Sequence, residues 1–177
     1  MGQRGERIID YLVEYTGEAL LTPSQQSAQA RRLLLSLLKK HYGLDSLPEM
    51  NAGKDGKPFF RAFPHIHFSL SHCRRAVMAV VGDSPVGCDI EDIRNDDAME
   101  ILDVAFTDAE RLHITTSANP IETLVRLWTR KEASVKLSGI IPDNPRDWPS
   151  APTEEIALST IGPLHGCFMT IAVTRSV

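Results

Sequence analysis

The apolar positions of residues 24–42 recur with the period of an α-helix. Their stripe consists of four leucines, Leu33, Leu34, Leu37 and Leu38. Thr22, followed by a proline and by Gln25 three residues on, forms a capping box of the kind that starts a helix. Gly43 supplies a stop at the other end. We therefore predict a helix over residues 24–42.

Two further helix starts lie in the second half of the chain. Thr107 and Glu110 form another capping box, which opens a short helix. Asn119, followed by proline and an acid, combines an N-cap with a favourable first turn. The helix that starts there is predicted to run to Ser138, with Gly139 as its C-terminal stop.

Short apolar runs with the alternation of β-strands lie between and after these helices. The runs are residues 66–71, 76–81, 87–91, 155–160 and 167–173. Because Asp83, Ser84 and Pro85 form a turn, we predict that runs 76–81 and 87–91 pair as a hairpin. Each half thus carries a helix, a turn-rich loop and strand runs, which is a weak indication of a duplicated α+β protein.

Composition narrows the class of protein. The chain has 177 residues, of which 42% are hydrophobic and 24% charged, as in ordinary globular proteins. No apolar run is long enough to suggest a membrane span, and a net charge of −4 gives no support for nucleic-acid binding. Three cysteines, an odd number without a C-x-x-C motif, favour a reducing, cytoplasmic compartment.

The first candidate site residues lie on run 87–91. Asp89 and Glu91 are two residues apart, so on a strand both carboxylates project from one face, opposite the apolar Cys88 and Ile90. Gly87 leaves room for another chain or a ligand to approach closely. Alternating acids are usually solvated, so this pair alone is a weak signal.

The second set lies on helix 120–138. Trp128, Glu132 and Lys136 share one helix face, on which a partly buried glutamate needs a partner. If strand and helix meet, Asp89, Glu91 and Glu132 converge beside Lys136. Clustered carboxylate oxygens are suitable ligands for Mg²⁺, and the lysine ammonium would neutralise the negative charge of a bound phosphate. The alternative to a metal site is an ordinary Glu–Lys ion pair on a helix surface, without a catalytic role.

A third set lies at the end of strand run 66–71. The Ser71 hydroxyl and the His72 imidazole could hold phosphate oxygens through hydrogen bonds. A lone Ser-His is more often structural, and without a matching acid it does not indicate a hydrolase triad. Lys57, in the turn Gly56-Lys57-Pro58, is by itself uninformative.

Together these motifs resemble those of the 4′-phosphopantetheinyl transferases of the surfactin-synthetase-activating (Sfp-like) class. The matching motifs, in order, are Gly56-Lys57-Pro58, Phe68-Ser69-Leu70-Ser71-His72, Gly87-x-Asp89-Ile90-Glu91 and Trp128-Thr129-x-Lys131-Glu132-Ala133-x-x-Lys136. The resemblance covers about residues 25–140.

The resemblance implies an α+β pseudo-dimer of two similar lobes, each a small, mainly antiparallel sheet packed with helices. We expect the lobes to be residues 1–87 and 88–177, with the active site in the cleft between them. The implied reaction transfers the 4′-phosphopantetheine arm of coenzyme A to a serine of an apo acyl or peptidyl carrier protein and releases 3′,5′-ADP.

The resemblance also implies a role for each matching residue. Asp89, Glu91 and Glu132 correspond to ligands of Mg²⁺, which Mn²⁺ could replace. Glu132 and Lys136 are the expected catalytic residues, as proton acceptor and as stabiliser of the leaving group. The expected contacts to coenzyme A are Lys57, Ser71, His72, Lys131 and Lys136. The family also has an arginine in its first helix that contacts a phosphate, and this arginine corresponds to Arg31 or Arg32. The protein is expected to be a cytoplasmic monomer that binds neither membrane nor nucleic acid.

The segment before Gly56 and the tail after Gly139 are shorter than the family pattern. Three alternatives stay open: the smaller holo-acyl-carrier-protein synthase class, a Mg²⁺-dependent phosphoesterase, and a degenerate member that binds without catalysis. Glu91 and Trp128 argue against the first. The sequence does not identify the carrier, which could serve fatty-acid or secondary-metabolite synthesis.

Overall fold

The computed structural model describes residues 8–17, 19–54, 56–94 and 98–175. Its strands are β1 (Ile9–Tyr15), β2 (Met50–Ala52), β3 (Pro58–Phe60), β4 (His67–Cys73), β5 (Ala76–Gly82), β6 (Val86–Asp92), β7 (Ile156–Leu164) and β8 (Cys167–Thr174). Its α-helices are α1 (Pro23–Tyr42), α2 (Leu102–Ala105), α3 (Asp108–Thr116) and α4 (Pro120–Ser138). Two short 3₁₀ helices, η1 (Ala98–Ile101) and η2 (Pro145–Asp147), complete the set.

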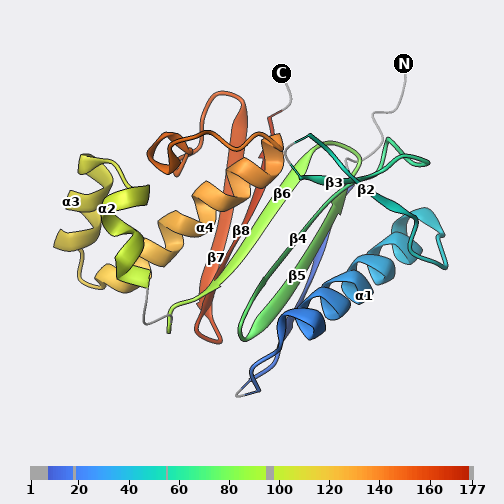
Figure 1. The fold of residues 1–177 in the computed structure, drawn as a ribbon, viewed down its shortest axis with the longest axis horizontal. Helices are drawn as coiled ribbons and strands as arrows, with labels where there is room; N and C mark the ends of the chain where they lie inside the picture. Colours follow the sequence, from blue (N-terminus) through green and yellow to red (C-terminus); the bar gives the residue numbers. More distant parts are fainter. Residues whose placement is uncertain (1–7, 18, 55, 95–97, 176–177) are drawn as a thin grey trace.

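The first half of the chain folds around a three-stranded antiparallel sheet with the order β1-β5-β4. Helix α1 lies along this sheet (Figure 1) and packs on β5 and β4. Its apolar stripe, including Leu34 and Leu38, is buried against Phe68 and Val81 of the sheet. The leucines that predicted the helix therefore also form its buried face, and the predicted caps mark its two ends.

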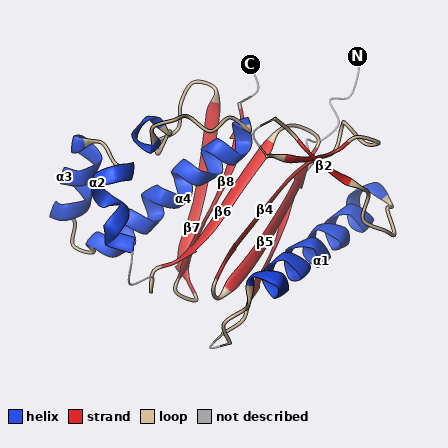
Figure 2. Ribbon diagram, in the orientation of Figure 1, coloured by secondary structure: helices blue, strands red, loops and turns tan. Residues whose placement is uncertain are grey.

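The second half repeats the plan with a different helix arrangement. Strands β6, β8 and β7 form another antiparallel sheet, in that order, and α4 packs on β6 and β8. The short helices α2 and α3 lie beside the first turns of α4, away from the first half (Figure 2). The prediction of an α+β fold with small antiparallel sheets is confirmed.

The two sheets meet through a shared apolar cluster. Met78 and Val80 of β5 pack with Cys88 and Ile90 of β6 and with Met169 of β8. The other face of the first sheet packs on α1, so every residue of β5 is buried. This central layer holds the halves together and brings β4 alongside β6.

Most predicted elements are confirmed. The helices that begin after Thr22 and Thr107 have both hydrogen bonds of a capping box, and α4 ends at Gly139 in a left-handed conformation. Asn119, predicted as an N-cap, makes no side-chain capping bond. The predictions from sequence did not include β1, which covers one edge of β5.

The predicted hairpin of runs 76–81 and 87–91 is wrong. Both edges of β5 are taken, by β1 and by β4, and β6 pairs with β8 instead. The turn at residues 83–85 therefore carries the chain from one sheet to the other. No helix among the described residues combines the length and apolarity that crossing a membrane requires.

Candidate active site

A hydrogen-bonded cluster joins the two halves where β4 and α4 flank β6. The Ser71 hydroxyl of β4 donates to Asp89 Oδ1 at 2.7 Å. The Lys136 ammonium of α4 donates to the same Asp89 oxygen at 2.6 Å and to Ser71 Oγ at 3.1 Å. Three residues that were predicted from separate motifs are thus in direct contact.

Serine side chains of β4 hold β6 in place. Phe68 of β4 is buried in the core beneath α1, so the alternating residues Ser69 and Ser71 face the other way. Ser69 Oγ accepts from the backbone N–H of Cys88 at 3.1 Å, and Ser71 Oγ accepts from that of Ile90 at 3.3 Å. The role of Ser69 was not predicted, although the alternation of the strand had placed it beside Ser71.

Gly87 sets the distance between β6 and α4. A Cβ atom at this position would lie 2.2 Å from the backbone oxygen of Ala133 and 2.3 Å from the backbone nitrogen of Leu137. The helix backbone therefore rests directly on the strand at the level of the cluster. The prediction that Gly87 allows a close approach is confirmed, and the approaching chain is α4.

Glu91 and Glu132 add two more acids to the cluster. Burial, followed by the charge of Asp89, raises the pKa of Glu91 to about 9. The same two causes raise the pKa of Glu132, whose Oε2 is 3.9 Å from Lys136 Nζ. Burial lowers the pKa of Lys136, but the charge of Asp89 and the bond to it raise that pKa by more. The site therefore holds more acidic groups than the single ammonium can neutralise.

The residues of this cluster fit a divalent cation in chemistry. Asp89 is 2% exposed, and its Oδ2 is buried without a hydrogen-bond partner among the described residues. A cation would give that oxygen a partner and would relieve the repulsion that raises the pKa of Glu91. Nowhere in the described ranges, however, are three His, Cys, Asp or Glu side chains already placed to hold a metal.

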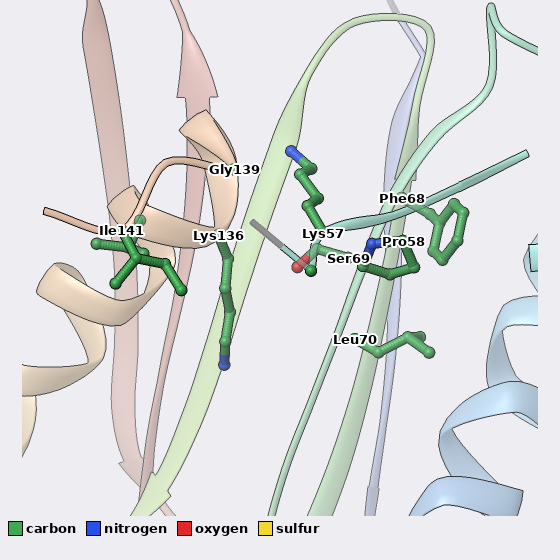
Figure 3. Close-up of a pocket in the computed structure, with 10 residues that line it drawn as sticks. Lys57, Pro58, Phe68, Ser69, Leu70, Lys136, Gly139 and Ile141 are labelled. Carbon is green, nitrogen blue, oxygen red and sulfur yellow. The ribbon is translucent and has the colours of Figure 1, made fainter. Parts of the chain in front are cut away.

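A pocket of about 230 Å³ adjoins the cluster. Lys136 and Ile141 lie on one side of β6, and Ser69 and Leu70 on the other (Figure 3). Lys57 also lines the pocket, but its ammonium is turned to the end of α4, where it donates to the backbone oxygen of Leu137 at 2.7 Å. Burial lowers the pKa of Lys57. Both halves of the chain thus supply walls to one pocket.

Three other predicted residues lie outside the cluster. The His72 side chain is exposed and, by the alternation of β4, points away from the face that carries Ser71. Arg31 and Arg32 are both exposed on α1, and Arg32 forms an ion pair with Glu14 of β1. The structure brings none of them to Asp89.

Lys131 is turned to a different face of α4. It is fully buried, with its ammonium 3.2 Å from Glu110 Oε2 of α3 and 5.5 Å from the centre of the Phe106 ring. It also donates to three backbone oxygens of the segment after the helix, those of Pro145, Arg146 and Trp148. These contacts describe a structural lysine that ties α3 and residues 145–148 to α4.

The buried cluster of Ser71, Asp89 and Lys136 thus lies beside a pocket that both halves of the chain line. Comparison with known proteins makes the class definite. The family model of the 4′-phosphopantetheinyl transferase superfamily matches residues 85–161.

Individual relatives agree with that match. The chain is 32% identical to the 4′-phosphopantetheinyl transferase AcpT of Salmonella typhi over 126 residues, which cover 69% of this chain and 66% of the relative. It is 38% identical to psf-1 of Bacillus pumilus over 89 residues, 48% of this chain and 37% of that one. It is 32% identical to gsp of Aneurinibacillus migulanus over 117 residues, 62% and 48%. These two relatives are also named 4′-phosphopantetheinyl transferases.

The chain belongs to the 4′-phosphopantetheinyl transferase superfamily, which confirms the resemblance found in its motifs. The aligned part is just under two thirds of AcpT in length and less of the other two relatives.

Proposed function

We propose that this protein transfers the 4′-phosphopantetheine arm of coenzyme A to a serine of an apo acyl or peptidyl carrier protein, with Mg²⁺, and releases 3′,5′-ADP. The observation that carries the proposal is the contact of Ser71, Asp89 and Lys136 at the junction of the two halves. Membership of the superfamily supplies the reaction, since the named relatives are transferases of this arm.

In this proposal residues 1–87 and 88–177 are the two lobes of a pseudo-dimer. The supporting feature is the repeated pairing of a three-stranded antiparallel sheet with one long helix, α1 in the first half and α4 in the second. The active site is the cleft beside β6, whose pocket is lined by both halves. We further propose a cytoplasmic protein, because the cysteines are free thiols, and a monomer, because one chain supplies both walls of the pocket.

Coenzyme A would bind through residues on both sides of this cleft. Lys136 and Ser71 would contact its pyrophosphate, and Lys57, already at the pocket wall, would approach the nucleotide end. His72 is exposed on β4 and is available to a phosphate on its own side of the strand. We leave Lys131 out of this set, because its ammonium is already bound within the second half.

Asp89, Glu91 and Glu132 would hold the divalent cation. Mg²⁺ bound there supplies charge neutralisation for the pyrophosphate during attack on its β-phosphorus. Asp89 orients the Lys136 ammonium, which stabilises negative charge on the leaving 3′,5′-ADP. Glu132 is the candidate acceptor of the proton from the carrier serine, a role that its raised pKa favours.

The direct experiment incubates the protein with coenzyme A, Mg²⁺ and apo carrier proteins and weighs the carriers intact. Addition of one phosphopantetheine per carrier is the expected result. Breakdown of coenzyme A without carrier modification would replace this proposal with a phosphoesterase. Binding of coenzyme A or carrier without any reaction would leave a binding module.

Two substitutions locate the site. Asp89→Asn and Glu132→Gln are expected to lower the transfer rate at least about 100-fold, because each removes a charge from the cluster while nearly keeping its shape. The matched controls are Asp108→Asn and Glu154→Gln, which change exposed acids and are expected to keep normal rates. Near-normal transfer by either site variant contradicts the assignment.

A further inference from the structure

Lys57 reaches from the turn between β2 and β3 to both elements that carry the acid cluster. Its ammonium donates to the backbone oxygen of Leu137, in the last turn of α4, at 2.7 Å. It also donates to the backbone oxygen of Val86, the first residue of β6, at 3.2 Å. One side chain thus joins the strand that holds Asp89 to the helix that holds Lys136.

The turn that carries Lys57 is fixed to the first sheet. Phe60 of β3 stacks on Phe68 of β4, with ring centres 4.4 Å apart, and both are buried in the core beneath α1. The turn is closed by its own backbone, because the Gly53 N–H donates to the Lys57 oxygen at 2.8 Å. Lys57 therefore extends from a backbone that is itself anchored.

The end of α4 is shaped to receive this lysine. The last carbonyls of a helix lack an intrahelical N–H partner and form the negative end of the helix dipole, so an ammonium beside the Leu137 oxygen is favourable. The lysine stem lies against Gly139, where a Cβ atom would be 2.9 Å from Lys57 Cδ. The ammonium caps the helix, and the stem fills space that only glycine leaves open.

These contacts lie next to the cluster along both elements. Leu137 directly follows Lys136 on α4, and Val86 lies three residues before Asp89 on β6. Lys136 Nζ is 2.6 Å from Asp89 Oδ1, a distance that a shift of the last turn of α4 along β6 would change. Lys57 restrains that shift, because it holds the end of the helix and the start of the strand at once.

An ammonium has three N–H donors, so the two bonds to backbone oxygens leave Lys57 able to contact a ligand in the pocket as well. The contact with coenzyme A proposed above and the attachment to α4 are therefore compatible.

We propose that Lys57 is a positioning residue for the transfer reaction: by joining the end of α4 to the start of β6, it sets the position of Lys136 relative to Asp89. This inference rests on the proposed transfer activity, but the attachment itself is measured without substrates.

The kinetic test uses Lys57→Met, which keeps most of the stem and removes the ammonium. With an apo carrier protein that the unchanged protein modifies, kcat should fall about 10-fold or more, and by a larger factor than KM for coenzyme A rises, because the reacting groups are misplaced. Lys54→Met, which changes an exposed lysine of the same turn region, is the control and should keep normal constants. A higher KM for coenzyme A with unchanged kcat would make Lys57 a ligand contact alone and overturn the proposal.

Hydrogen exchange tests the attachment without substrates. The last turn of α4 includes the Gly139 N–H, which donates to the Val135 oxygen at 2.9 Å. Amides of this turn should exchange faster in Lys57→Met than in the unchanged protein or in Lys54→Met, since the helix end has lost its tie. Equal exchange in all three proteins would contradict the proposal. If the unchanged protein modifies no carrier, the proposed function fails, and the exchange comparison still decides whether Lys57 holds α4.

A pair of glycine variants displaces the lysine without removing its charge. Gly43 and Gly139 end α1 and α4 with nearly the same left-handed φ, +66° and +67°. A Cβ atom at Gly43 would meet nothing within 4 Å, whereas one at Gly139 would meet the Lys57 stem. Both alanine variants should lose stability from backbone strain, but only Gly139→Ala should also lower kcat.

The loss of kcat in Gly139→Ala should disappear as a separate effect when Lys57→Ala is already present, because the stem that the new Cβ displaces is gone. Equal kcat values for Gly43→Ala and Gly139→Ala, or a full additional loss in the double variant, would overturn the positioning role.

Discussion

Helix α4 carries two lysines of one motif in two different regions of the molecule. Lys136 faces β6 at the junction of the halves, where it shares Asp89 with Ser71. Lys131, five residues earlier and so about 140° around the helix, is enclosed by α3 and residues 145–148. One lysine borders a pocket and lies among excess acids, whereas the other has its charge and donors satisfied internally. A shared motif therefore does not imply a shared task.

The largest effect on stability is expected from Lys131→Met. The substitution leaves the half-buried Glu110 carboxylate without its ammonium and removes one donor from each of three backbone oxygens, which should cost about 3–5 kcal/mol of unfolding free energy. Urea unfolding measures the loss. Adding Glu110→Gln should recover part of it, and a Lys131→Met protein of normal stability would show that the buried pair is dispensable.

Lys136→Met is expected to act mainly on the reaction. Transfer should fall about 100- to 1000-fold, because in the proposed mechanism the ammonium bound by Asp89 stabilises the leaving group and the variant lacks it. Mass spectrometry of the carrier product measures the rate.

The cation provides a second readout that separates the two lysines. Without Lys136 the acids of the cluster repel one another, so millimolar Mg²⁺ should raise the melting temperature of Lys136→Met more than that of the unchanged protein. For Lys131→Met, Mg²⁺ should raise the melting temperature no more than it does for the unchanged protein, because this substitution lies away from the acids of the cluster. Equal responses of both variants would contradict the division of α4 into two regions.

The smallest effect concerns the pH dependence of the Lys131 region. Burial raises the pKa of Glu110, but hydrogen bonds from Ser150, the backbone of Thr107 and Lys131 lower it further, so the net pKa lies below the ordinary 4.5. Stability from this group is thus fully present above pH 4.5 and is lost as the pH falls through the folded-state pKa.

The stability difference between the unchanged protein and Glu110→Gln should therefore shrink as the pH is lowered from 6 toward 3. Urea unfolding at several pH values measures it. Asp108→Asn, which changes an exposed acid on the same helix, is the control and should show a smaller change with pH. A difference that stays constant, or grows on acidification, would mean that Glu110 is not ionised in its pair.

Local signals predicted much of the fold. The capping boxes at Thr22 and Thr107 and the left-handed glycines after α1 and α4 are decided by residues a few positions apart, so sequence was enough. The pairing of strands was not local. The turn at residues 83–85 suggested a hairpin, but β1 and β4 occupy both edges of β5, and competition for an edge cannot be read from a turn.

In the candidate site, too, the sequence predicted relations between residues close in the chain and did not predict contacts between distant ones. Spacing alone placed Asp89 beside Glu91 on one strand face and Glu132 beside Lys136 on one helix face, because these relations follow from the geometry of strand and helix. The contact of Ser71 with Asp89 depends on β4 lying beside β6, which no local rule states. The turn of Lys57 toward the end of α4 likewise depends on a distant partner.

The amino-acid sequence was therefore sufficient for the long helices, for the strands from β4 onward, for the faces of their side chains and for the family, but not for β1, β2 and β3. What it determined depends on residues close in the chain or on ordered motifs. Tertiary packing brought Lys136 to Asp89 and Ser71 of the acid cluster and enclosed Lys131 between α3 and residues 145–148. Each of these partnerships joins residues far apart in the chain, and their energy exists once packing has removed water and brought the groups into contact.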